Sequence, residues 1–463
     1  MKFKHLLSAF LVVLILLSFN VCYSIETSSD EIQQIIKKAQ PQVFADSAIL
    51  LDVDSNKVLY EKNSKNLMYP ASTTKLLTAI LVVEHCSDLS QKVNISYYAV
   101  NSVPYTYSTA NIQPGEQFSI KDLLNALLIE SANEAAYALA EYVSNEGNNY
   151  LTDESQTTRL LFESSMASFS TMMNEKAKQL GCNNTNFVNP NGIHNENHYS
   201  TAYDLMLIGK YAYSNSIIRA ICQKFQFSLP NTSRYNGEIR TFKTTNALLR
   251  IDKPGFYAYA NGLKTGYTDA AQSCIIASAN KGDRNLIAVI LHSPESEDEN
   301  ASRENDCKRL FEYGFNVFTN SVLVKQGSIV KQIRIENGTE NTSVLNLISD
   351  SELKTLMINQ APIDITPEIE ITKNQAPISQ GEIVGSIEYN INGEILKANL
   401  LAEHSVLKAD FTYIIIILVC IFIIFIICLV LLIIYKIKHG KDEHEHEHKH
   451  EAKKDHKTKK EKK

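Results

Sequence analysis

The first residues whose types and spacing could do chemistry are Ser72 and Lys75, within the segment 69–79. An apolar run follows them, which predicts a helix that begins here with Ser72 at or near its N-cap. Residues three apart lie on the same face of a helix, so the lysine amine would face the serine hydroxyl. This spacing permits a serine nucleophile with a lysine base. A capping serine beside a surface lysine would give the same pattern, so the rest of the chain must decide.

Two further short motifs follow in the chain. Ser131-Ala132-Asn133 stands at a break between two apolar helical stretches, and Lys264-Thr265-Gly266 precedes two apolar runs that are typical of strands. Each motif alone is weak. The three together, in this order, form the motif set of β-lactamases and penicillin-binding proteins.

These motifs and their spacing closely resemble the low-molecular-mass penicillin-binding proteins, the serine-type D-alanyl-D-alanine carboxypeptidases. The stretches at 189–192, 198–204 and 262–268 resemble the same family. The resemblance covers about residues 45–320 and is less specific beyond them. Departures from the family pattern occur at Ala132, at Asn261 and in an insertion near 145–165. None of them removes a reactive side chain.

The resemblance implies that Ser72 Oγ attacks the carbonyl carbon between two terminal D-alanines and forms an acyl-enzyme. Lys75 must be neutral to take the proton, so its pKa must lie well below the usual value of about 10.4. Burial and a second cation nearby both lower a lysine pKa, and Lys264 can supply that charge. Ser131 would relay a proton to the leaving amine, and Asn133 would hold the substrate amide.

The resemblance also implies a binding site for the substrate's free carboxyl terminus. Lys264 and Thr265 would bind the carboxylate region, and Gly266 would let the strand backbone approach the substrate closely. The backbone N–H groups of the nucleophile and of Tyr267 would form an oxyanion hole. Arg303, at the start of a predicted helix, would help to bind the carboxylate, a task for which the planar guanidinium is suited. A surface charge on a helix is the alternative for Arg303.

Patterns of strands and helices place the three motifs in one α+β domain. A strand hairpin is predicted over 47–61, helices over 120–129, 134–143, 201–213 and 301–313, and strands over 273–279 and 286–291. Strands at both ends of this region enclose a helical middle, so the first and last strands should share a sheet. The resemblance implies the same architecture, a β-lactamase/transpeptidase-like catalytic domain with an antiparallel sheet beside a helical region.

After about residue 320 the pattern changes to short alternating runs separated by turns such as Asn337-Gly338 and Asn392-Gly393, which predicts a small all-β domain. The segment 413–435 is uncharged, long enough to cross a bilayer as one helix, and followed by lysines. The expected division is a signal peptide at 1–24, a catalytic domain at 25–320, an all-β domain at 321–405, a transmembrane helix at 413–435 and a cytoplasmic tail at 436–463.

The basic start and short apolar centre of residues 1–24 are typical of a secretory signal. Together with the apolar helix, this predicts a single-pass protein of the cell membrane with its catalytic domain outside the cytoplasm and a short tail inside. The expected partners are peptidoglycan stem peptides that end in D-Ala-D-Ala, β-lactams as inhibitors, and the membrane. The net charge of -6 gives no indication of a nucleic-acid surface.

No cofactor and no catalytic metal are expected. The body of the chain has no H-x-x-x-H or similar zinc set, which argues against a metallopeptidase. His194, His198 and Asp204 fit structural roles in a loop and a helix cap. The alternating His and Glu residues at 444–450 could bind Zn²⁺ or Ni²⁺ weakly, or form a solvated charge run. The five cysteines at 86, 182, 222, 274 and 307 have irregular spacing, which favours buried thiols over a disulfide framework.

Two other functions stay open at this point. A β-lactamase-like hydrolase of class A needs a glutamate for deacylation, and no clear E-x-x-L-N stretch follows Asn133. A penicillin-sensing or wall-sensing module would be acylated without turnover. The short predicted tail leaves little room for a signalling domain, which disfavours the second alternative.

Overall fold

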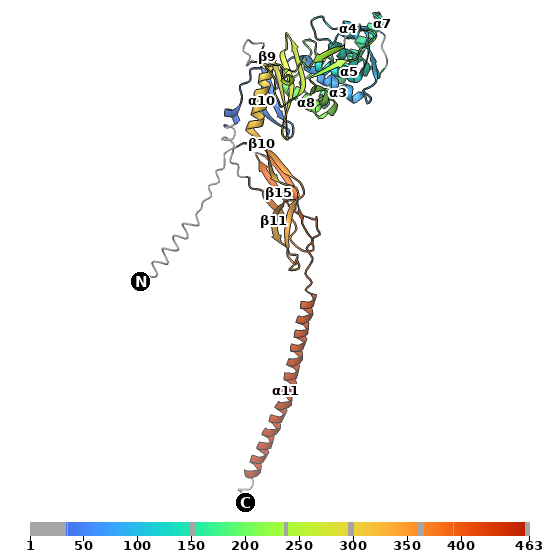
Figure 1. The fold of residues 1–463 in the computed structure, drawn as a ribbon. Coiled ribbons are helices and arrows are strands. Elements are labelled where there is room, and N and C mark those ends of the chain that lie inside the picture. The colour runs from blue at the N-terminus through green and yellow to red at the C-terminus, as the bar shows by residue number, and fades with distance from the viewer. Residues whose placement is uncertain are drawn as a thin grey trace, which may run out of the picture. The chain divides into compact units, whose positions relative to one another are not determined.

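The computed structural model describes residues 34, 36–147, 153–235, 239–294, 301–359, 365–391 and 393–458 (Figure 1). The predicted signal peptide lies outside the described residues, as does Asn392 of the predicted Asn392-Gly393 turn. The chain divides into two compact units. The first comprises Met1–Ser321 with Thr355–Asp364, and the second comprises Val322–Lys354 with Ile365–Lys463.

A five-stranded antiparallel sheet forms the centre of the first unit, with the strand order β2-β1-β9-β8-β7. Its strands are β1 (Ser47–Asp52), β2 (Lys57–Lys62), β7 (Ala260–Thr268), β8 (Gln272–Lys281) and β9 (Arg284–Ser293). Leu50 of β1 pairs with Ala288 of β9, so the first and last strands share the sheet as predicted. This order leaves β7 at one edge of the sheet.

Both faces of this sheet are buried, and alternate residues enter two different cores. In β9, Ile287 and Val289 pack in the core that contains α3 (Lys75–His85) and α8 (Ala202–Ser214). Their neighbours Ala288 and Ile290 pack in the core that contains residues of α10 (Arg303–Val317). Figure 1 shows α10 on one side of the sheet and the helical region on the other. A strand covered on both faces reads as a continuous apolar run because side chains alternate between the faces.

The helical region connects β2 to β7. It contains the 3₁₀ turn η1 (Ala71–Thr74), the π-helical turn η2 (Ala126–Glu130), the 3₁₀ turn η3 (Ala247–Leu249), and the helices α3, α4 (Tyr97–Asn101), α5 (Ile120–Asn125), α6 (Asn133–Ser144), α7 (Gln156–Gln179), α8 and α9 (Ser216–Cys222). Two small two-stranded antiparallel sheets lie among them, β3 (Lys92–Asn94) with β4 (Gln117–Ser119) and β5 (Gln226–Leu229) with β6 (Arg240–Lys243). Thr201 caps α8, since its side chain accepts a hydrogen bond from the Asp204 N–H.

Three local features add detail to the sequence-based predictions. Ser72 lies in η1, two residues before Thr74, the N-cap of α3. The helix predicted over 120–129 is α5 followed by a π-helical turn, η2. Within the predicted insertion at 145–165, helix α7 already begins at Gln156. Only a narrow stripe of α7 is buried, including Phe162 and Phe169, so most of its surface is polar and the helical period is weak.

The second unit contains the predicted all-β domain and an apolar helix. A five-stranded sheet has the order β11-β12-β16-β15-β14, and β10 pairs with β13. The strands of this five-stranded sheet are β11 (Ile329–Arg334), β12 (Val344–Ser349), β14 (Glu368–Ile371), β15 (Ile383–Ile391) and β16 (Glu394–Ala402). Strands β10 (Phe318–Val324) and β13 (Leu353–Ile358) each have residues in both units. Helix α11 runs over Thr412–Thr458, and its part Thr412–Lys438 is long and apolar enough to cross a membrane.

A buried ion pair joins β1 and β9 of the first unit's sheet to the chain around α10. Arg284 Nη2 lies 2.7 Å from Asp52 Oδ2, and Arg284 Nη1 donates to the carbonyl oxygens of Gly314 and Phe318 at 2.8 and 2.7 Å. The Asp52 side chain is fully buried. Losing the guanidinium would therefore leave a buried carboxylate without its counter-charge.

We expect Arg284→Leu to lower the free energy of unfolding by about 3–5 kcal/mol, because breaking a buried pair leaves one charge uncompensated. Chemical denaturation of the full chain in detergent, followed by tyrosine near-ultraviolet circular dichroism, would measure this. The control is Arg159→Leu, which removes an exposed pair with Glu163 and should leave the transition unchanged. Equal denaturation midpoints for Arg284→Leu and the parent would contradict the assigned role.

Candidate active site

The predicted nucleophile lies on the 3₁₀ turn η1, which leads directly into α3. The Thr73 N–H and hydroxyl both donate to the carbonyl oxygen of Pro70, at 3.3 and 2.7 Å, and these bonds close the turn. Lys75 is the first residue of α3 and is fully buried, whereas Ser72 is partly exposed. The turn therefore presents the serine to solvent and places the lysine beneath it.

The Lys75 amine has three close oxygen neighbours. Its Nζ lies 2.8 Å from Ser72 Oγ, 2.9 Å from Asn133 Oδ1 and 2.6 Å from the carbonyl oxygen of Asn191. The two oxygens of Asn133 and Asn191 can only accept hydrogen bonds, so they take both N–H groups of a neutral amine. The lone pair of that amine is then directed at the hydroxyl of Ser72. This is the arrangement that a lysine base requires.

The electrostatics favour a neutral Lys75. Burial lowers its pKa well below the usual 10.5, the charge of Lys264 lowers it further, and Glu134 opposes both. Burial also lowers the pKa of Lys264 to about 7. Two amines buried this deeply cannot both hold a proton at low cost, since each charge loses its hydration.

The second motif is positioned by a distorted helix end. Ser131 follows η2 in a left-handed conformation with φ of 68°, and Asn133 begins α6. The Asn133 N–H and Nδ2 both donate to the carbonyl oxygen of Ser108, at 3.1 and 2.9 Å. These bonds leave Asn133 Oδ1 for Lys75 and fix the loop that contains Thr106 and Ser108 beside the motif.

The third motif lies on β7, the edge strand. The Lys264 Nζ is buried and donates to the Thr265 carbonyl oxygen at 2.9 Å. The Thr265 hydroxyl forms a hydrogen bond of 2.7 Å with the Thr245 hydroxyl. Gly266 packs directly against the nucleophile, because a Cβ on this glycine would lie 2.9 Å from Ser72 N. A side chain here would push β7 away from the turn.

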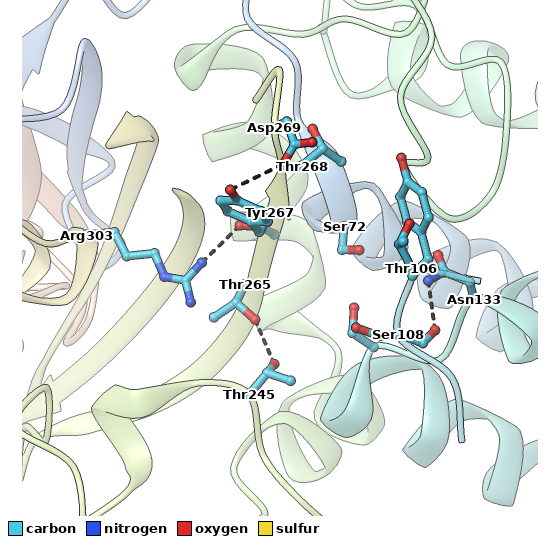
Figure 2. A pocket seen from close by; sticks show the side chains of 13 residues that line it. Ser72, Thr106, Ser108, Asn133, Thr245, Thr265, Tyr267, Thr268, Asp269 and Arg303 are labelled. Atoms are coloured by element: carbon cyan, nitrogen blue, oxygen red, sulfur yellow. Dashed lines mark hydrogen bonds between the residues drawn. The ribbon is translucent and has the colours of Figure 1, made fainter. Parts of the chain in front are cut away.

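A cavity of about 480 Å³ opens between β7 and the helical region. Its lining residues are Ser72, Thr106, Tyr107, Ser108, Ser131, Asn133, Thr245, Thr265, Gly266, Tyr267, Thr268, Asp269 and Arg303. Figure 2 shows Ser72 between the β7 residues on one side and Asn133 with its loop on the other. All nine predicted site residues come together here. Seven of them line the cavity, and the other two, Lys75 and Lys264, lie buried beside it.

Arg303 contributes the cation at the outer side of β7. Its Nη1 donates to the carbonyl oxygen of Gly266 at 2.9 Å and to that of Cys274 at 3.3 Å, and its Nε donates to Glu304 Oε1 at 2.9 Å. These contacts hold the guanidinium against β7 and β8 at the edge of the cavity (Figure 2). Arg303 is thus part of the site and not a free surface charge.

Sequence reasoning missed several contributors to the site. Thr245, the loop residues Thr106–Ser108 and the carbonyl oxygen of Asn191 all reach it from distant segments. Asn191 belongs to a stretch that the family resemblance includes, but nothing in the sequence indicates that its carbonyl contacts Lys75. The other residues have no pattern of their own, because threonine, tyrosine and serine are common in loops.

The residues predicted to be structural also have structural contacts. His198 is buried, with its Nε2 2.8 Å from the Thr74 hydroxyl and its Nδ1 accepting from the Val188 N–H, and burial lowers its pKa to about 3. Asp204 accepts hydrogen bonds from Asn184 and Thr185. The cysteines at 86, 182, 222, 274 and 307 are free and buried. No group of His, Cys, Asp and Glu in the described part of the chain could hold a metal ion.

Comparison with known families decides the identity. Residues 34–154 and 162–295 match the D-alanyl-D-alanine carboxypeptidase family. The chain belongs to this family. Residues 318–408 match a second family, the penicillin-binding protein 5 C-terminal domain. The predicted family, fold class and enzyme class of this carboxypeptidase are therefore confirmed, and its family acts on D-Ala-D-Ala peptides and binds penicillin.

Individual relatives share most of the chain. The D-alanyl-D-alanine carboxypeptidase DacF of Bacillus subtilis is 29% identical over 416 residues, which are 88% of this chain and 96% of that one. Penicillin-binding protein 5 of Haemophilus influenzae has a solved structure that is 25% identical, with a TM-score of 0.57 over 80% of this chain and 99% of that one. The Streptomyces K15 DD-transpeptidase structure is 30% identical, with a TM-score of 0.51 over 60% and 98%.

We expect Gly192→Ala to lower the rate of Ser72 acylation at least about 100-fold, because displacing a reacting group by about 1 Å can cost this much. Gly192 has φ of 81°, and a Cβ there would lie only 1.9 Å from the carbonyl oxygen of Ala71, next to the nucleophile. Labelling of the protein by a fluorescent penicillin measures the rate. The matched control is Gly282→Ala, which has φ of 67° but open space around the added Cβ. Similar losses in both variants would show that backbone strain, and not contact with the nucleophile turn, is responsible.

Proposed function

We propose that this carboxypeptidase removes the terminal D-alanine from peptidoglycan stem pentapeptides through an acyl-enzyme on Ser72. One observation carries the proposal, the distance of 2.8 Å between Ser72 Oγ and a fully buried Lys75 amine. The other two neighbours of this amine are hydrogen-bond acceptors, which favours a lone pair directed at Ser72.

The reaction begins when Ser72 Oγ attacks the carbonyl carbon between the two D-alanines and its proton passes to Lys75. The backbone N–H groups of Ser72 and Tyr267 bind the oxyanion that forms. The C–N bond then breaks, and the leaving D-alanine amine takes a proton from Lys75, relayed by Ser131. Water next attacks the ester with Lys75 as base, which releases the shortened peptide and restores the Ser72 hydroxyl.

Substrate recognition uses the two sides of the cavity. Lys264, Thr265 and Arg303 bind the terminal carboxylate, and Gly266 allows the peptide to approach the strand. Asn133 holds the substrate amide from the opposite side. Because β7 is an edge strand, an extended peptide can add along its outer side, as in other cases of strand addition. β-Lactams are the expected inhibitors, since they would acylate the same serine.

The proposed organisation follows from the two units and the apolar helix. Residues 25–320 form the catalytic domain after removal of a signal peptide at 1–24, and 321–405 form an all-β domain that lies between it and the anchor in the sequence. Residues 413–435 anchor the protein as a single span, and 436–463 form the cytoplasmic tail. Support for the anchor comes from the length and apolar composition of Thr412–Lys438, and support for the orientation comes from the lysines that follow the apolar run.

The full chain in detergent should release D-alanine from diacetyl-Lys-D-Ala-D-Ala, and penicillin should block this release. Ser72→Ala should abolish it because no acyl-enzyme can form, whereas the control Ser90→Ala, at an exposed serine outside the cavity, should retain it. Released D-alanine is measured with a coupled oxidase assay. Acylation by penicillin without D-alanine release would favour the sensing module. Rapid turnover of penicillin without peptide hydrolysis would favour the β-lactamase-like hydrolase.

The pH dependence should reveal the role of Lys264. A lysine binds a carboxylate only while protonated, and the Lys264 pKa is about 7. We therefore expect kcat/KM for the peptide to fall above about pH 7, by up to about tenfold per pH unit as the protonated fraction falls. The C-terminal amide of the same peptide lacks the carboxylate, so its inhibition constant as a competitor should not change over this range. A parallel change for both ligands would contradict carboxylate binding by Lys264.

A further inference from the structure

A buried carboxyl group next to the cavity has no part in the reaction described above. Glu134 directly follows Asn133 on α6 and is 1% exposed. Its Oε1 accepts the backbone N–H groups of Ala110 at 2.6 Å and Ile112 at 3.4 Å. Its Oε2 has no hydrogen-bond partner among the described residues. Glu134 thus joins the start of α6 to the end of the loop that lines the cavity at Thr106–Ser108.

The titratable groups around Lys75 come from four segments. Lys264 on β7 repels a proton on Lys75, and Glu134 on α6 attracts it. Glu130, on η2, acts instead on Lys264, and burial raises the Glu130 pKa to about 7. His198 is held neutral by burial and contributes no positive charge near neutral pH. Glu134 is therefore the carboxyl group that acts on the predicted base.

Burial and hydrogen bonding act in opposite directions on the ionisation of Glu134. The pKa of Glu134 lies above its usual value because burial is the largest effect, while the backbone N–H groups of Glu134 itself, Ala110 and Ile112 and the charge of Lys75 oppose this rise. Two N–H donors on Oε1 suit an anion. A proton on Oε2 would find no acceptor among the described residues, and burying an unpartnered O–H group is costly.

We propose that Glu134 supplies the buried negative charge that stabilises protonated Lys75 during acylation, while its two hydrogen bonds hold the loop beside the cavity. Glu134 is a positioning residue, since it acts through Lys75 and the loop. The inference rests on the proposed roles of Ser72 and Lys75. When Ser72 gives up its proton, Lys75 becomes a buried ammonium, and an anion nearby lowers the cost of this charge.

The opposing effects on Lys75 explain why such a charge is useful. Burial and Lys264 make Lys75 neutral before the reaction, but they also weaken it as a base. General-base catalysis is most efficient when the pKa of the base lies near the operating pH. An anion on α6 raises the Lys75 pKa without solvent reaching the amine. The neutral resting state and the protonated intermediate are then both accessible.

The test compares Glu134→Gln with the parent in the full chain in detergent, using the pH profile of Ser72 acylation by a fluorescent penicillin. Glutamine keeps the size and the Oε1 acceptor but removes the charge. Because Glu134 raises the Lys75 pKa, its loss should lower that pKa and move the acid limb of the profile about one pH unit lower. A weaker base should also reduce the plateau rate about threefold. Glu134→Asp keeps a charge at greater distance, so its limb should lie between the two.

Glu141→Gln is the matched control. Glu141 lies on the same helix, is 2% exposed, and accepts a hydrogen bond from Ser96 at 2.6 Å, but it does not act on Lys75. Its profile should keep the parent's acid limb. The inference is overturned if Glu134→Gln lowers the melting temperature but leaves the acid limb of the pH profile unchanged. It is also overturned if Glu141→Gln moves the acid limb by the same amount as Glu134→Gln.

Two further outcomes separate this inference from the proposed function. If Glu134→Gln does not melt cooperatively, Glu134→Asp takes its place, and a limb identical to the parent's would then overturn the inference. In one outcome, the parent protein releases D-alanine while Glu134→Gln and Glu134→Asp show the same pH profile of acylation as the parent. That result would support the proposed function and overturn only the role of Glu134. A parent that penicillin does not acylate would overturn the proposed function and this inference together.

Discussion

The contact between a buried amine and a partly exposed hydroxyl is the constraint on which the rest of this structure depends. Lys75 must lie out of water to be neutral, yet within 2.8 Å of a serine that substrate can reach. Placing the two residues on either side of a 3₁₀-to-α junction meets both needs. The carbonyl oxygens of Asn133 and Asn191 then fix the direction of the lone pair, which burial alone would leave undefined.

The nucleophile turn is held in place by the close approach of the backbones of β7 and of the 189–192 loop. Glycine residues in these two segments permit this approach. Gly266 brings β7 to the N–H of Ser72, and Gly192 brings the 189–192 loop to the carbonyl of Ala71. The sheet behind β7 is buried on both faces, so it is a rigid support for the edge strand. The proposed oxyanion hole of two backbone N–H groups would depend on this rigidity, because its donors cannot adjust as side chains can.

The sequence predicts this site better than it predicts the details of the fold. The types and spacing of reactive residues predict the three motifs, and the apolar runs predict the strands β1 and β9 that pair in the sheet. Thr245 and the Thr106–Ser108 loop could not be predicted, because only tertiary folding brings them to β7 and α6. The burial of Lys75 is likewise a property of the packed structure alone.

Lys75 and Lys264 are equally removed from water, yet the proposed reaction needs opposite states of them, a neutral base and a cationic ligand for the carboxylate. Burial cannot distinguish the two, and the charges around each amine also act in mixed directions. Glu134 raises the Lys75 pKa, while Glu130 raises and Arg303 lowers that of Lys264. The substrate itself is therefore the deciding group. A bound carboxylate adds a negative charge beside Lys264, which favours the proton there and, through the repulsion between the amines, keeps it off Lys75. In the proposed mechanism, binding of the carboxylate end of the peptide thus favours a neutral Lys75 before the attack.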